Sequence, residues 1–330
     1  MTNSGQLNLF GEDPSTDAVR PADVSQEWRE VAERLPAGVY LGTSSWSFPG
    51  WAGLIYRDPL STGRLARDGL AAYAKHPLMR VVGIDRTYYA PISAEDFAAY
   101  ANATPDAFRF MTKAHNAVTQ PRVRERDEYG GTIWRENPHY LDPQYATDEV
   151  ITPMRRGLGH RVGPLVFQFE PMAPAMIGGP RTWLDGLRRF LEALPRETLY
   201  AVEIRNAELL TAGYAETLSR LGAAHCYTVH PAMPPIARQI AICPVGDFPA
   251  SVARWNLRRN LDYAGAQRKY DPFDRIVDAD DTTRDELAGL CLESLRLAVP
   301  VYCTVNNKAE GSSPLSVARL ARAIADRLPQ

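Results

Sequence analysis

Four residues have side chains suited to acid–base or nucleophilic chemistry, and each stands where a short apolar run of the sequence ends. They are Asp85, Lys113, Glu203 and Arg205. Two carboxylates and a lysine permit general acid–base catalysis, and a desolvated lysine forms Schiff bases with carbonyl substrates. Glu203 and Arg205 are two residues apart, so in a strand they lie on the same side. They form either a structural ion pair or, when a substrate engages the arginine, a base beside a cation.

Seven short apolar runs must position these residues, and each run ends abruptly in polar residues. Short runs of β-branched and aromatic residues are typical of buried strands, and helical patterns fill most of the gaps between them. This repeated order predicts a parallel sheet, which a chain of 330 residues can close into a TIM-like (β/α) barrel with its polar strand ends on one rim. The runs cover residues 39–41, 81–84, 108–111, 165–167, 200–202, 226–229 and 301–305. Helices are expected near residues 65–75, 94–101, 180–194, 283–297 and 314–328, and from residue 142.

The seventh strand of the barrel in chain order has two candidate positions. Residues 240–242 and residues 252–253 are both short and apolar. We favour the second position, because it delivers Arg254, Trp255 and Asn256 to the rim where the other strands present their polar residues.

Two polar segments are too long for ordinary connections between a strand and the next helix. They cover about residues 116–141 and 257–280. Connections of that length are usually lids or binding elements, so we predict two insertions. Residues 1–25 are rich in Ser, Asp, Pro, Thr and Gly, which predicts a flexible tail before a single barrel domain over residues 26–330.

Composition excludes several classes of protein. With 45% apolar and 23% charged residues, the chain is typical of globular proteins. No apolar run approaches the ~18 residues of a membrane helix, and the first residues lack the features of a signal peptide, so we expect a cytoplasmic protein with no membrane partner. The four cysteines form no C-x-x-C pair and are expected to be reduced. A net charge of −2 gives no global attraction to nucleic acid, so such binding needs a local patch.

The loop after the last strand has the composition of an anion site. Ser313 and Pro314 form an N-cap and first-turn pair, so the amides of the last helix point back into the loop. Loops after the late strands of such barrels often bind phosphate in this way, and the alternative is an ordinary capped helix with a surface lysine. The residues expected to bind the ligand here are Asn306, Asn307, Lys308, Gly311 and Ser312.

Other polar and aromatic residues also fall at strand ends. Aromatic side chains beside arginines can stack on bases or sugars, or they can simply seal the mouth of the barrel. A histidine at a strand end carries protons, binds metal or serves as a hydrogen-bonded support. The sequence has none of the residue spacings typical of metal ligands that would support a metal site, and no motif indicates a particular cofactor. The further candidates for ligand binding are Trp46, Tyr88, His115, Gln168, Arg254 and Trp255.

A short apolar island interrupts the polar tail. Gln6, Leu7, Leu9 and Phe10 lie where there is no core to bury them, and such residues often fold onto a partner's groove. Residues 6–10 resemble the peptide Gln-Leu-Ser/Asp-Leu-Phe with which many bacterial replication and repair proteins hold the DNA sliding clamp. Asn at the third position departs from that pattern. Alternatively, the apolar residues fold back under the barrel.

Together the motifs resemble the domain-of-unknown-function 72 family, also called YecE-like. The resemblance runs from about residue 38 to the C-terminus and implies a TIM-like barrel with its site at the carboxyl ends of the strands, but it implies no reaction. Two departures are visible: the family's second strand typically carries Glu and Asn where this chain has Asp85 and Arg86, and Gln120 follows Thr119 where the family usually has Thr-His. The matching stretches are residues 41–46 with Trp51, 85–89 with Pro91, 108–110 with Lys113, 168–169 with Pro171, 202–205, 254–255 and 306–307.

The leading functional hypothesis is a barrel that binds a phosphate-containing ligand, a nucleotide or a nucleic-acid strand, at its carboxyl-terminal rim. For a phosphodiester hydrolase, Glu203 or Asp85 would position water while Lys113, Arg205 and Arg254 neutralise charge. One alternative is a lyase or isomerase acting on a phosphorylated sugar, with Lys113 or Glu203 as base. Another is a non-catalytic adaptor that the tail recruits to the sliding clamp.

Overall fold

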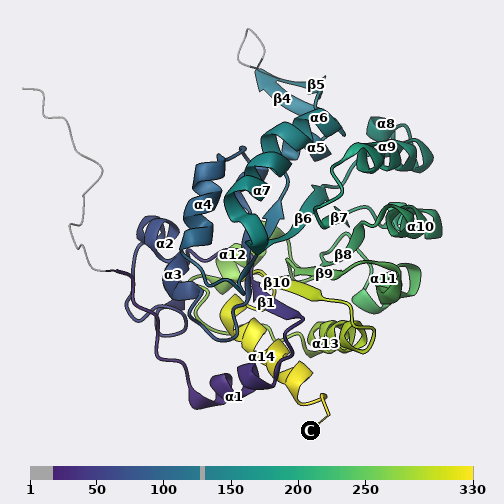
Figure 1. The fold of residues 1–330 in the computed structure, drawn as a ribbon. Coiled ribbons are helices and arrows are strands. Elements are labelled where there is room, and N and C mark those ends of the chain that lie inside the picture. Colours follow the sequence, from purple (N-terminus) through teal and green to yellow (C-terminus); the bar gives the residue numbers. More distant parts are fainter. Residues whose placement is uncertain (1–17, 127–130, 330) are drawn as a thin grey trace, which may run out of the picture.

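Eight parallel strands close into a barrel in the computed structural model, which describes residues 18–126 and 131–329 (Figure 1). β10 pairs back onto β1 and completes the ring, so the predicted TIM-like barrel is confirmed. In order around the barrel, the strands are β1 (Val39–Thr43), β2 (Val81–Ile84), β3 (Arg109–Lys113), β6 (Val162–Phe169), β7 (Tyr200–Ile204), β8 (Ala224–Val229), β9 (Ser251–Trp255) and β10 (Val301–Val305).

The seventh of these strands, β9, occupies the second of its two candidate positions. It pairs with β8 on one side and β10 on the other, whereas residues 240–242 end helix α11. Alternation along β9 sends Arg254 into the mouth of the barrel and Trp255 to the opposite side of the strand, where it is buried in the core.

Helices surround the barrel on its outer face (Figure 1). The predicted helices are present, and the one expected from residue 142 starts as a short turn capped by Asp142 and continues through a π-helical segment, Ala146–Ile151, into α7. The covering helices are α2 (Thr62–Asp68), α3 (Leu70–Tyr73), α4 (Ala94–Asn102), α6 (Pro143–Tyr145), α7 (Thr152–Leu158), α8 (Pro174–Ile177), α9 (Pro180–Ala193), α10 (Ala212–Leu221), α11 (Ile236–Ile242), α13 (Asp281–Arg296) and α14 (Ser313–Ala325).

The first insertion builds a β-hairpin that projects from the barrel (Figure 1). Helix α5 (Asn116–Thr119) leads into β4 (Arg122–Arg126), which pairs antiparallel with β5 (Thr132–Glu136). The sequence indicated the insertion but not this hairpin.

The second insertion folds down onto the loop that follows β10. It contains α12 (Tyr263–Tyr270) and a small apolar cluster of Leu257, Ala266, Tyr270 and Phe273. Its backbone is hydrogen-bonded to the loop, because the Arg258 amide donates to the Lys308 carbonyl and the amides of residues 277 and 278 donate to the Glu310 carbonyl. The insertion therefore covers the start of α14.

Helix α1 (Gln26–Arg34) precedes the barrel and packs against α14. The predicted clamp-binding peptide over residues 6–10 lies outside the described residues. No helix in the described part of the chain is long and apolar enough to cross a membrane.

Gly42 shows how closely β1 and β2 approach. A Cβ atom at this position would overlap the Val81 carbonyl oxygen, which belongs to the backbone of β2 and cannot move away independently. Gly42→Ala is expected to destabilise the fold by more than about 3 kcal/mol, measured by urea unfolding. The control is Gly63→Ala in α2, where a Cβ would meet no atom within 4 Å and should be neutral or slightly stabilising. Equal midpoints for the two variants would contradict this packing.

Candidate functional site

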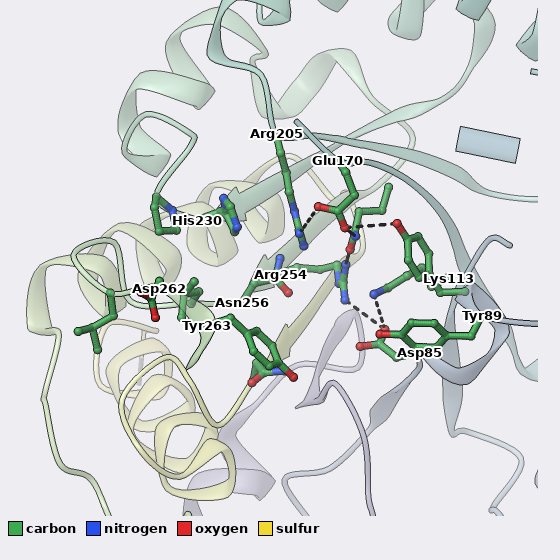
Figure 2. A pocket seen from close by; sticks show the side chains of 16 residues that line it. Asp85, Tyr89, Lys113, Glu170, Arg205, His230, Arg254, Asn256, Asp262 and Tyr263 are labelled. Carbon is green, nitrogen blue, oxygen red and sulfur yellow. Dashed lines mark hydrogen bonds and ion pairs between the residues drawn. The ribbon is translucent and has the colours of Figure 1, made fainter. Parts of the chain in front are cut away.

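A cavity of about 480 Å³ lies at the carboxyl ends of the barrel strands (Figure 2). Three cationic and three acidic side chains line it together with tyrosines, amides and one histidine. The structure thus brings together seven of the residues expected from the sequence: Asp85, Tyr88, Lys113, Gln168, Arg205, Arg254 and Asn306. The other polar and aromatic residues in its wall are Tyr89, Glu170, His230, Asn256, Asp262 and Tyr263.

Glu203 lies behind this cavity at the centre of a hydrogen-bond network. Its side chain is fully buried and is contacted by Arg254, by Arg205 Nε at 3.2 Å, by Asn256 Nδ2 at 3.0 Å and by Thr228 Oγ1 at 3.3 Å. Burial alone would raise the pKa of this carboxyl, but the surrounding positive charges, those of Arg254 and Arg205 above all, outweigh burial and lower it to about 2. Glu203 is therefore a fixed counter-charge.

Arg254 connects Glu203 to the wall of the cavity. Its Nη1 also donates to Gln168 Oε1 at 2.7 Å, and its Nη2 donates to Asp85 Oδ1 at 3.2 Å. Lys113 Nζ shares the same Asp85 oxygen at 3.3 Å. Burial lowers the pKa of Lys113, and the charge of Asp85 offsets part of that effect. Arg254 thus bonds directly to residues of β6, β7 and the end of β2, and through Asp85 it is linked to Lys113 of β3.

Glu170 completes the network, although it was not among the residues expected from the sequence. Its Oε2 accepts from Arg205 Nη1 at 2.8 Å, and its Oε1 accepts from Gln168 Nε2 at 2.5 Å and from the Tyr88 hydroxyl at 3.3 Å (Figure 2). Glu170 follows β6 by one residue and stands two residues after Gln168, a spacing that could have revealed it. Its side chain is 36% exposed, so it is an accessible carboxylate of the cavity, as is Asp85 at 33%.

His230 is another cavity residue that was not expected from the sequence, although it directly follows β8. Burial, followed by the charge of Arg205, lowers its pKa to about 4, so the ring is neutral at pH 7. Its Nδ1 accepts a hydrogen bond from the Ala232 amide at 3.2 Å. The ring proton of the neutral form therefore resides on Nε2.

Three of the predicted ligand-binding residues outside the loop after β10 lie away from the cavity wall. Trp46 and Trp255 are buried in the core, where Trp46 packs edge-on against Tyr100, so the structure corrects the expectation that they line the cleft. His115 Nδ1 lies 2.7 Å from the Tyr145 hydroxyl, and burial lowers its pKa. His115 thus matches the alternative of a hydrogen-bonded support.

The loop after β10 also differs from expectation, because Asn307, Lys308, Gly311 and Ser312 are all buried. The Asn307 side-chain oxygen accepts from the Ser313 amide at 2.8 Å and so occupies the start of α14. The second insertion closes the loop from outside, leaving only Asn306 of this group in the cavity wall. The first amide of α14 is thus already bonded within the protein, and these four residues lie outside the cavity wall, so anion binding by them stays a prediction from the sequence.

A metal site was not predicted from the sequence. Within residues 18–126 and 131–329, no group of three or more His, Cys, Asp or Glu side chains is placed to hold a metal ion.

A closed parallel barrel with a polar cavity at the carboxyl ends of its strands defines a TIM-like barrel protein with its candidate site where such barrels carry their active sites. Residues 40–330 match the family described as "Protein of unknown function DUF72", and the chain belongs to this family.

Comparison with individual proteins agrees with this assignment. The chain is 28% identical over 184 residues to the UPF0759 protein YecE of Escherichia coli K12, a match that spans 55% of this chain and 54% of that protein. Its fold is similar to two solved DUF72 structures. One, from Enterococcus faecalis, has a TM-score of 0.56 at 16% identity, with 88% of this chain and 97% of that one covered. The other, from Thermotoga maritima, has a TM-score of 0.56 at 19% identity, with 86% and 98% covered.

Replacing the charge of Glu203 tests the network. Glu203→Gln leaves Arg254 and Arg205 without their buried counter-charge and should lower the free energy of unfolding by about 3–5 kcal/mol at pH 7. The folded pKa of about 2 is below the ordinary value of 4.5, so the carboxylate stabilises fully above about pH 4.5 and loses its effect as pH falls toward 2. The difference between wild type and variant should therefore shrink over that window in denaturant titrations.

The matched control is Glu192→Gln on α9, whose partner Arg188 is on the surface. Its effect should stay within about 0.5 kcal/mol at every pH. A Glu203→Gln protein as stable as the control would contradict the assigned role of the buried carboxylate.

Proposed function

We propose that the protein binds a small phosphate-containing ligand, a nucleotide in the first place, in the cavity at the carboxyl ends of the strands. One observation carries this proposal. Arg205 lines the cavity with its Nε and Nη1 held by Glu203 and Glu170, while its Nη2 has no hydrogen-bond partner among the described residues. A guanidinium held through two of its three nitrogens, with the third open, is a pre-oriented donor for a phosphate oxygen.

The cations of the cavity are more deeply buried than its carboxylates, which favours a ligand with an anionic end and neutral polar groups elsewhere. The cations are the less exposed groups, at 10% for Lys113, 14% for Arg205 and 5% for Arg254. Asp85 and Glu170 are more exposed, so they are placed to accept hydrogen bonds from hydroxyl or amino groups nearer the mouth. Because acids balance cations in the wall, the cavity selects a particular arrangement of groups and does not attract polyanions in general.

The size and the aromatic residues of the cavity fit a nucleotide. A volume of about 480 Å³ falls among sites for small molecules, which span about 300–1,000 Å³. Tyr89 and Tyr263 line the cavity and are largely exposed, at 75% and 66%, so their rings are available to stack on a base.

For hydrolysis of a phosphodiester, Asp85 is the carboxylate best placed to position water. Lys113, Arg205 and Arg254 would stabilise the charge that develops on the phosphoryl oxygens. Glu203 is less suited to that role, because both of its oxygens already accept hydrogen bonds and it lies outside the cavity wall. A link to the sliding clamp through residues 6–10 stays a prediction from the sequence.

Titration calorimetry at low salt with common mononucleotides and inorganic phosphate tests the proposed ligand class. Arg205→Ala should raise Kd by about ten- to a hundredfold, because a hydrogen bond to a charged group contributes about 1.5–3 kcal/mol. Arg188→Ala is the control, since that arginine pairs with Glu192 on the surface of α9. Failure of every nucleotide to bind, or an unchanged Kd in Arg205→Ala, would refute the proposal.

A second candidate function follows from Lys113. Its amine lines the cavity 4.8 Å from the centre of the Tyr88 ring, and burial lowers its pKa, which favours the nucleophilic neutral form. A lyase or isomerase that holds the carbonyl of a phosphorylated sugar as an imine would use such a lysine.

Borohydride trapping separates this second candidate from the first. The Lys113 amine attacks the carbonyl carbon, water leaves, and borohydride reduces the resulting imine to a stable secondary amine. Incubation with phosphorylated aldoses and ketoses should then add the reduced sugar mass to Lys113 in peptide mass spectrometry. Lys113→Arg should show no adduct. Absence of an adduct with all sugars tried would eliminate the Schiff-base reaction.

A further inference from the structure

The hairpin of β4 and β5 has two different faces. Directly opposed residues of an antiparallel pair lie on the same face, so the register places Thr132, Trp134 and Glu136 beside alternate residues of β4. Val123 and Ile133, on the other face, are half-buried. The first face is exposed along its length and consists of Arg122, Arg124, Arg126, Thr132, Trp134 and Glu136. We call these six residues the arginine face.

Trp134 is the most unusual member of the arginine face. Its side chain is 61% exposed, which is costly for so large an apolar group unless something covers it. It stands opposite Arg124, whose Nε and Nη2 bond to Thr132 Oγ1 at 3.4 and 3.1 Å. The contact fixes that guanidinium across the strand pair. An indole therefore lies in the middle of a row of arginines.

The spacing of the row fits a nucleic-acid backbone. Alternate residues of a strand are about 7 Å apart, similar to the distance between successive phosphates of an extended single strand. A row of arginines with an exposed aromatic ring is how proteins hold single strands, because the cations contact phosphates while the ring stacks on a base. Among the six residues only Glu136 is acidic, opposite Arg122, so the face remains cationic although the chain carries a net charge of −2.

The base of the hairpin lies next to the cavity. Gln120, two residues before β4, donates to the Tyr88 hydroxyl at 3.2 Å, and Tyr88 lines the cavity. At the other end of the hairpin, the Asn137 side chain returns to the same turn and donates to the Gln120 carbonyl. Both strands of the hairpin are thus anchored beside the cavity wall.

We infer, on the basis of the proposed function, that the ligand is a single-stranded oligonucleotide. One nucleotide occupies the cavity, with its phosphate on Arg205, and the neighbouring nucleotides follow the arginine face, where a base stacks on Trp134. The cavity supplies the chemical selection and the hairpin supplies affinity for the strand.

Fluorescence anisotropy with labelled oligothymidylate of about twelve nucleotides tests the inference on the full chain. Trp134→Ala should weaken binding by about tenfold, and Trp134→Phe should retain most of it because an aromatic ring remains. Replacing Arg122, Arg124 and Arg126 together by Ala should lower the dependence of log K on log salt by about 2, since each phosphate contact on a single strand contributes about 0.7. Arg188→Ala is the control for loss of a surface cation.

Mononucleotide binding separates the two proposals. The inference predicts that hairpin variants lose oligonucleotide affinity but bind mononucleotides normally, whereas Arg205→Ala loses both. Wild-type oligonucleotide binding by the hairpin variants would overturn the inference and leave the proposed function intact. If the hairpin variants lose oligonucleotide affinity but Arg205→Ala changes the binding of neither ligand, the arginine face would remain a nucleic-acid surface. The proposed nucleotide site in the cavity would then be refuted. Equal or tighter binding of polyglutamate or phosphatidylglycerol vesicles, lost in the same variants, would overturn the assignment to nucleic acid.

Discussion

The burial of one carboxylate is the constraint on which the rim of this barrel depends. Glu203 has no contact with solvent, so its charge requires cations and hydrogen-bond donors at short range. Arg254 and Arg205 meet that requirement from β9 and from the residue after β7, and each then orients a more exposed carboxylate, Asp85 and Glu170 respectively. The positions of the accessible carboxylates, Asp85 and Glu170, therefore follow from the need to compensate the buried charge of Glu203. Such preorganisation lowers the cost of aligning donors when a ligand enters.

The sequence predicted the barrel and the centre of the site because both depend on local patterns. Strand-then-helix order specifies a parallel sheet, and the two-residue period of a strand places Glu203 and Arg205 on one side. The same reasoning located β9, since of the two candidates only residues 252–253 lead into polar residues, Arg254 and Asn256, as the other strand ends do. The contact between Glu203 and Arg205 was thus visible in the sequence, whereas the contact between Glu203 and Arg254 depends on how the barrel closes.

The expectations from the sequence that differ from the structure concern two properties. One is the side of the strand on which a residue lies, and the other is the segment that folds over it. Trp46 and Trp255 stand at strand ends just as Tyr88 does, but a strand end has two sides and the sequence around it does not say which one opens to the cavity. Ser313 and Pro314 correctly predicted a helix start, but the N-cap is Ser312, one residue earlier, and its side chain makes no capping hydrogen bond. Whether such a helix start is open to a ligand depends on the segment that folds over it. That segment, residues 257–280, is distant in the chain and carries no periodic pattern. Glu170 was missed because the apolar run recognised in the sequence ends at residue 167, whereas β6 continues to Phe169 and brings Glu170 to the rim.

The pairing of β1 with β10 has a consequence for how the protein is made. These two strands stand near opposite ends of the barrel sequence, yet all five residues of each are in register. During synthesis the first strand leaves the ribosome long before its partner exists, so the ring has two unpaired edges until the last strand is added. Open edges of parallel strands are sites of wrong association, and contacts this distant in sequence form slowly. The nascent chain therefore passes through a long interval in which it depends on its helices, or on chaperones, to keep those edges apart from other chains.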